Sequence, residues 1–320
     1  MPRPVVLLGP QRPNPNLLEA LNARVPGDGH LVAVTAGWRH DEGEDLALRE
    51  HVGVRTVHLP LYRWFDELTA SAPELVAAWR ARQDKLRSLK RVYRMRLGHA
   101  LEALFGVERA ADDEDPAAVA PQRAFALEAL RNVDAQLLAH ADELRSADPE
   151  LNHTWLHKAV APYHAEVQTA LSDARALLLA GGHVGVLLNR LKFFGVPEAL
   201  ADHPDVGVVA WSAGLMAITQ QIVLFYDDAP DGEAWPEVFD TGLGMVGGLV
   251  ALPHAKRRLR LEDTARVSLL AWRFAPEAAI GLENGAWIER RRSGWVNCGR
   301  PGTAFRLCPD GQLRALKAAT

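Results

Sequence analysis

The 320-residue sequence has only two cysteines, Cys298 and Cys308, and no long uninterrupted apolar run. The cysteines lie ten residues apart, without CxxC spacing and without a histidine cluster beside them. This pattern predicts reduced thiols and argues against a disulfide scaffold or a zinc site. No stretch approaches the roughly 18 uncharged apolar residues of a membrane span. We therefore expect a folded protein with no membrane among its partners.

An excess of charge of one sign is also missing. The chain has 36 lysine and arginine residues against 40 aspartate and glutamate residues, which gives a formal net charge of -4. A mildly negative chain is not typical of general nucleic-acid binders, so nucleic acid is not an expected partner. The apolar run Val5–Leu8 is too short for a secretory signal, and we expect a cytoplasmic location.

The first sixty residues alternate short apolar runs with a segment of helical spacing. The runs are Val5–Leu8, Leu31–Val34 and Val54–Leu59, and Asn16–Arg24 has leucines at helical steps. Continuous apolar strands separated by helices indicate an α/β fold, in which helices cover both faces of a parallel sheet.

A long helical segment then interrupts this pattern. From Pro73 to about Ala147 the apolar residues recur at three- and four-residue steps, and an acidic stretch with proline, Asp112–Pro116, predicts a solvated turn between two helices. The first helix carries eight basic residues between Arg80 and Arg96, against Asp84 alone. These basic residues predict either a solvated face that pairs with the acidic turn or a contact with an anionic partner.

The α/β pattern resumes near Ala176 and continues to the C-terminus. The expected elements are a strand at Ala176–Leu179, a helix at Val184–Phe194, a strand at Val206–Ala210, a helix from Leu215 to about Leu224, and a C-terminal β-meander after His254. We therefore expect one α/β domain formed by residues 1–63 and 151–320, with residues 64–150 as a helical insertion.

The most informative segment is Val206–Gly214, where a strand turns sharply into a helix at Ser212. Small residues two positions before and after the serine, Ala210 and Gly214, are typical of a nucleophile elbow. Such a turn exposes the Ser212 hydroxyl above the sheet edge. It also places the Ala213 N–H at a helix N-terminus, where it can stabilise an oxyanion.

A serine nucleophile needs a base, and the base needs an orienting acid. His254 follows the apolar, glycine-rich run Gly242–Ala251, a usual position for a catalytic residue at the end of a strand. His183 is the rival base. Asp227 and Asp228, which we expect at the end of the helix that begins at the elbow, are the candidate acids.

Several of these motifs resemble the dipeptidase E and cyanophycinase family of serine peptidases. The segment Trp211–Gly214, Asp227 fifteen residues after Ser212, and Pro253-His254 are similar to the family's serine, aspartate and histidine motifs. The turn Ala180–His183 resembles a Gly-Gly-Gly-Asn turn of the family, and Ala275–Ile288 resembles its closing strands.

The resemblance implies a class I glutamine amidotransferase-like fold, with a flavodoxin-like parallel sheet, and a Ser-His-Asp catalytic triad. The implied roles are nucleophile Ser212, base His254, acid Asp227 (or Asp228), oxyanion donors Gly182 and Ala213, and substrate-binding residues Arg266, His183 and Glu283. It implies no metal and no cofactor. The sequence departs from the family at His183, which replaces asparagine, at Ala180, which replaces glycine, and in the helical insertion.

The sequence therefore predicts a serine hydrolase that cleaves a small peptide or amide bond. The resemblance implies that this bond is an aspartyl bond or, as in cyanophycinase, a β-aspartyl bond. A true glutamine amidotransferase is disfavoured because that chemistry uses a cysteine at the elbow. A catalytically silent binding module is the alternative from another class. The insertion is expected to form a cap, a homodimer contact or a contact with another partner.

Overall fold

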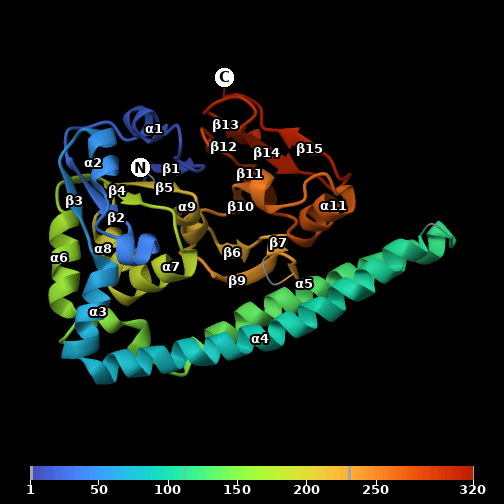
Figure 1. Cartoon of the computed structure of the whole chain (residues 1–320), viewed down its shortest axis with the longest axis horizontal. Coiled ribbons are helices and arrows are strands. Elements are labelled where there is room, and N and C mark those ends of the chain that lie inside the picture. The colour runs from blue at the N-terminus through green and yellow to red at the C-terminus, as the bar shows by residue number, and fades with distance from the viewer. Residues whose placement is uncertain (1–2, 112, 230–231, 320) are drawn as a thin grey trace.

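A seven-stranded, mostly parallel sheet forms the centre of the computed structural model (Figure 1). The structure describes residues 3–111, 113–229 and 232–319; for residues 228, 229, 232 and 233 it describes the backbone alone. The strand order is β13-β12-β1-β5-β4-β2-β3. The five parallel strands are β1 (Val5–Leu8), β2 (His30–Val34), β3 (Thr56–His58), β4 (Ala174–Leu179) and β5 (Gly207–Trp211). Antiparallel β12 (Trp287–Arg291) and β13 (Gly294–Asn297) complete one edge. The predicted α/β class with a mostly parallel sheet is confirmed.

Two separate apolar cores explain why the strands are apolar on both faces. Alternate residues of β1 and β2 pack either against α1 and α2 or against the helices of the opposite face. The first face is covered by α1 (Leu17–Arg24) and α2 (Leu46–Val52). The opposite face carries α3 (Leu61–Ser71), α6 (Ala161–Leu171), α7 (Val184–Phe193) and α8 (Val196–Asp202). Short 3-10 turns lie at η1 (Ala36–Asp41), η2 (Pro149–Asn152) and η3 (Thr154–Leu156).

A second, four-stranded sheet has the order β10-β11-β14-β15. Its strands are β10 (Leu249–Pro253), β11 (Ala278–Leu282), β14 (Ala304–Leu307) and β15 (Leu313–Ala315), and α10 (Ala255–Arg258) and α11 (Thr264–Arg273) connect β10 to β11. The C-terminal segment is therefore not the single β-meander that the sequence predicted. The β12–β13 hairpin pairs with β1 of the large sheet, whereas β14 pairs with β11 and β15 pairs with β14, so the tail divides between two sheets.

The helix that follows the elbow is shorter than the sequence predicted. This helix, α9 (Ala213–Ile218), ends where the Thr219 hydroxyl donates to the Met216 carbonyl at 2.8 Å. The next residues form β6 (Gln221–Leu224), which pairs with β9 (Glu237–Thr241), and β7 (Asp228–Ala229) pairs with β8 (Gly232–Glu233). The β-branched pair Ile222-Val223 suits a strand better than a helix. Asp227 therefore follows a strand rather than a helix.

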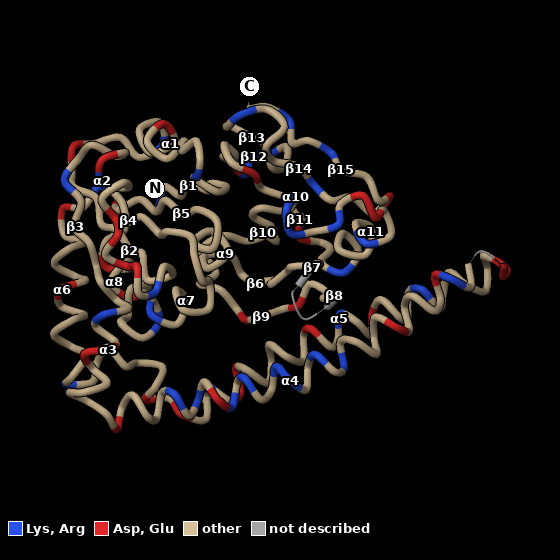
Figure 2. The backbone as a smooth tube through the Cα atoms, viewed as in Figure 1, with Lys and Arg blue, Asp and Glu red and all other residues tan. Residues whose placement is uncertain are grey.

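A long antiparallel pair of helices, α4 (Pro73–Ala110) and α5 (Pro116–Ser146), runs along the body, and its tip projects beyond it (Figure 1). We call this pair the helical hairpin. Each helix begins with proline, and Asp115 caps α5 by accepting a hydrogen bond from the Ala117 N–H. Basic and acidic residues are interspersed along both helices (Figure 2). Asp112 of the predicted acidic turn lies outside the described residues.

None of the described helices is both long and apolar enough to cross a membrane. Cys298 and Cys308 are free thiols, as the sequence predicted.

A buried ion pair fastens the helical hairpin to the body. Asp134 of α5 accepts hydrogen bonds from Arg273 of α11 at 2.7 Å on both carboxylate oxygens and from the Tyr93 hydroxyl of α4 at 2.8 Å. Arg273 also donates to the Pro236 carbonyl, and the Tyr93 oxygen accepts from the Val238 N–H. One charged pair thus joins α4, α5, α11 and β9.

We predict that Arg273→Met lowers the free energy of unfolding by about 3–5 kcal/mol, because Asp134 would be left as a buried charge without its partner. Urea denaturation measures the change. The matched control is Arg87→Met, whose exposed pair with Asp84 should contribute about 0–1 kcal/mol. Equal losses in the two variants would contradict this account of the attachment.

Candidate active site

Ser212 occupies the turn between β5 and α9 with a left-handed backbone, φ 51° and ψ -119°. Its N–H donates to the Leu8 carbonyl of β1 at 3.2 Å, which ties the turn to the neighbouring strand. A non-glycine residue in this region is strained, and such strain gathers at functional sites. The predicted sharp turn is present, and the fully buried, small Ala210 precedes it.

The turn requires glycine at position 214. A Cβ atom there would lie 2.1 Å from the Leu179 carbonyl oxygen at the end of β4, closer than any side chain tolerates. The absence of a side chain therefore lets the start of α9 pack directly on the end of β4. Ala213 begins α9, and the first N–H groups of a helix have no intrahelical acceptor.

The turn after β4 lies directly beside the serine. A Cβ at Gly181 would be 3.4 Å from the Ser212 Oγ. Gly182 has φ +111°, and a Cβ there would be 2.4 Å from the Gly37 carbonyl oxygen, so only glycine fits. The Gly182 N–H donates no hydrogen bond to any other residue that the structure describes. Gly182 and Ala213 thus offer two backbone donors on turns that meet at Ser212.

Two cavities of about 600 Å³ meet at Ser212. The first, which we call the apolar cavity, lies under the helical hairpin and has Leu97 and Leu101 of α4 together with Trp235 in its wall. The second, which we call the His254 cavity, is lined by Trp38, Gly181, Ser212 and His254. A cap was one of the roles expected of the insertion, but the sequence did not single out Leu97 and Leu101, because they follow the same helical spacing as the other buried leucines of α4.

His254 follows β10, as predicted, and its backbone is left-handed with φ 60°. Its N–H donates to the Leu282 carbonyl of β11 at 2.9 Å. Burial lowers the pKa of the imidazole, and the nearby charges of Arg258 and Arg257 lower it further. The neutral ring, which is the form that can accept a proton, is therefore favoured at neutral pH.

Asp227 is fully buried, and its carboxylate contacts Arg266 rather than His254. Arg266 Nη2 lies 2.9 Å from Oδ1 and Nε lies 2.8 Å from Oδ2, and the Arg260 N–H donates to Oδ2 at 2.8 Å. The Asp227 N–H donates to the Arg258 carbonyl. No hydrogen bond joins the His254 ring to any described residue. The structure therefore does not bring Asp227 and His254 into the direct contact that a triad requires.

Arg266, predicted to bind substrate, is also buried. Its guanidinium lies 3.7 Å from the centre of the Trp235 ring and donates to the Ala234 carbonyl at 2.6 Å. Arg266 is not among the residues that line the apolar cavity, whereas Trp235, whose ring it contacts, is. Arg258, which sequence reasoning did not single out, lines the cavity directly.

The remaining predicted residues have local structural contacts. His183 is the N-cap of α7, where its Nδ1 accepts a hydrogen bond from the Val186 N–H at 3.2 Å, a role that asparagine also performs well. Glu283 accepts from the Lys256 N–H at 2.8 Å, and burial raises the pKa of its carboxyl group. The side chain of Asp228 lies outside the described part of the structure.

Comparison with known proteins bears on the fold. No protein-family model and no curated protein matches the sequence. Among solved structures, the chain is similar to a crystal structure of a peptidase from an acI-B1 Actinobacterium, with a TM-score of 0.50 and 12% sequence identity over 100% of this chain and 96% of that chain. The likeness extends over the whole length and shows that the two chains share an α/β fold with a mostly parallel sheet.

We predict that Gly214→Ala lowers the free energy of unfolding by about 1–3 kcal/mol, the usual cost of forcing an extra carbon into a close-packed site. The control is Gly106→Ala in α4, where the nearest atom to the new Cβ is 4.0 Å away. That variant should gain about 0.5–1 kcal/mol, because alanine is the better helix former. Chemical denaturation of both variants is the measurement, and an unaffected Gly214→Ala protein would contradict the close packing at the elbow.

Proposed function

We propose that the protein is a serine hydrolase with Ser212 as nucleophile and His254 as base, acting on a small peptide or amide bond. The observation that carries this proposal is the strained turn at Ser212, which lies against Gly181 and shares one cavity with His254. The similarity to a solved peptidase structure adds support at the level of fold.

In this mechanism, the neutral His254 imidazole takes the Ser212 proton as Oγ attacks the substrate carbonyl. The N–H groups of Gly182 and Ala213 stabilise the oxyanion of the tetrahedral intermediate. Removing one such donor from a serine protease costs about 3–4 kcal/mol of transition-state stabilisation. Protonated His254 then donates its proton to the leaving amine, and water repeats the sequence on the acyl-enzyme.

Asp227 acts in this proposal as a positioning residue. It binds the backbone of Arg258 and Arg260, the segment that follows His254 through α10, and Arg266 neutralises its buried charge. Asp227 thereby fixes the loop that carries the base. Direct orientation of the imidazole by Asp227 would need a side-chain rearrangement when substrate binds.

The substrate is proposed to be a short peptide that places one side chain in each cavity. The apolar cavity suits an apolar or aromatic group beside Trp235, and Arg258 at its wall can pair with a carboxylate. The resemblance to dipeptidase E favours an aspartyl peptide, and a β-aspartyl bond is the cyanophycinase-like alternative. Hydrolysis rates across a dipeptide library that includes both linkages would distinguish these choices.

We predict that a fluorophosphonate probe labels the protein once per chain and that Ser212→Ala abolishes the labelling, because only an activated serine reacts. Intact-mass spectrometry measures the adduct. The matched control, Ser172→Ala at an exposed position after α6, should react as the unsubstituted protein does. A well-folded protein that fails to react would instead favour a binding module.

We predict that labelling stays fast as the pH is lowered past about 6.5, the ordinary pKa of histidine, because burial and Arg258 lower the pKa of His254. The rate should fall only when the pH drops through that lowered pKa, since protonated His254 cannot act as a base. Arg258→Met should move the fall to higher pH, and the exposed Arg292→Met should not. Labelling rates between about pH 5 and 8 measure these profiles, and a fall at the same pH in all three proteins would contradict the role of Arg258.

A further inference from the structure

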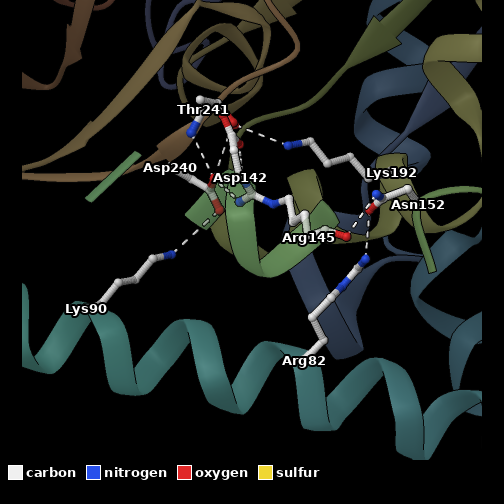
Figure 3. A network of polar contacts seen from close by, with 8 residues as sticks. All are labelled: Arg82, Lys90, Asp142, Arg145, Asn152, Lys192, Asp240 and Thr241. Carbon is white, nitrogen blue, oxygen red and sulfur yellow. Dashed lines mark hydrogen bonds and ion pairs between the residues drawn. The ribbon is translucent and has the colours of Figure 1, made fainter. Parts of the chain in front are cut away.

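A separate cavity of about 310 Å³ lies where the helical hairpin meets the body, and none of its lining residues surrounds Ser212. Its wall combines residues of α4, the end of α5, η2, α7 and β9 (Figure 3). We call it the hairpin cavity. Its size is at the lower end of the range for small-molecule sites.

The hairpin cavity is lined by more positive than negative side chains. Its charged lining residues are the cations Arg82, Lys90, Arg145 and Lys192 and the carboxylates Asp240 and Glu198. Four positive charges against two negative charges leave a surplus of two. A further carboxylate, Asp142, pairs with Arg145 at 2.8 Å, but its side chain is 63% exposed and does not line the cavity.

The two lysine ammonium groups have few partners for their burial. Lys90 Nζ lies 3.7 Å from Asp240 Oδ2 and 3.5 Å from the centre of the Phe239 ring. Lys192 Nζ donates to the Thr241 carbonyl at a long 3.3 Å. Each ammonium has three N–H donors, so both retain donors for another acceptor. Burial lowers the pKa of both lysines and outweighs the carboxylates that act on them, which are Asp240 on both, Glu237 on Lys90 and Asp142 on Lys192.

Arg82 and Arg145 account for the attachment of the hairpin at this place. Arg82 donates to Asn152 Oδ1 at 2.8 Å and to the Leu151 carbonyl at 2.9 Å, and Arg145 bonds to Asp240. The Arg82 Nε is nevertheless buried without a hydrogen-bond partner, although the residue is only 4% exposed. Because this atom is enclosed by the protein, Arg82 contributes its positive charge to the cavity wall rather than a free donor.

We propose that the hairpin cavity binds a small oxyanion of two negative charges, either inorganic phosphate or the phosphate group of a small molecule, held by the ammonium groups of Lys90 and Lys192, with Arg82 adding positive charge to the wall. Such a group matches the surplus charge, and its oxygens can accept from several separate donors at once. The site is independent of the proposed hydrolase activity, because it shares no residue with the surroundings of Ser212.

Isothermal titration calorimetry of the full chain with inorganic phosphate, at low ionic strength, tests the proposal. We expect saturable binding of one phosphate per chain. Lys90→Met and Lys192→Met should each weaken it by about tenfold or more, since each removes one charge-assisted contact. The matched control is Lys85→Met, on the same helix but outside the cavity, which should bind phosphate as the unsubstituted protein does.

A second titration with glycerol 3-phosphate distinguishes the two sources of the anion. Tighter binding than that of inorganic phosphate assigns the site to a phosphate ester, and weaker binding assigns it to the free anion. The proposal is overturned if the unsubstituted protein shows no saturable binding, a result that needs no variant to fold. It is also overturned if folded Lys90→Met or Lys192→Met retains the affinity of Lys85→Met.

Discussion

The contact between the end of β4 and the start of α9 is the constraint on which the candidate site depends. Gly214 has no side chain, so its backbone packs against the Leu179 carbonyl, and Ser212 must then adopt its left-handed conformation. The same contact brings Gly181 against the serine hydroxyl. A single close approach of two backbones thus sets the position of Ser212, the proposed nucleophile, and of the glycine turn beside it.

The helical hairpin gives this site its shape on one side. Leu97 and Leu101 form part of the wall of the apolar cavity, and the Asp134–Arg273 pair holds α5 against the body. Because that ion pair is buried and joins both carboxylate oxygens of Asp134 to Arg273, it favours one position of the hairpin on the body. The hairpin therefore supplies part of the cavity wall and is also fastened to the body that carries the rest of the site.

Sequence reasoning reached the strands of the large sheet and the elbow because their signals are local. Val206–Gly214 combines an apolar run with small residues at fixed positions around Ser212, and β5 forms there as expected. The end of α9 and the pairing of the tail strands depend on tertiary partners, so no local pattern revealed them. For the same reason the Asp227–Arg266 pair could not be predicted: the sequence shows an aspartate fifteen residues after Ser212 but not that the Arg266 guanidinium packs against its carboxylate.

We propose that Ser212, Gly182, Ala213 and His254 form one reaction centre. A crystal structure of the fluorophosphonate adduct tests it most directly. We expect phosphorus bonded to Ser212 Oγ, with a phosphonyl oxygen about 2.7–3.1 Å from the Gly182 and Ala213 nitrogens and the His254 ring within hydrogen-bond reach. An adduct on another residue, or a phosphonyl oxygen that points away from both nitrogens, would contradict it.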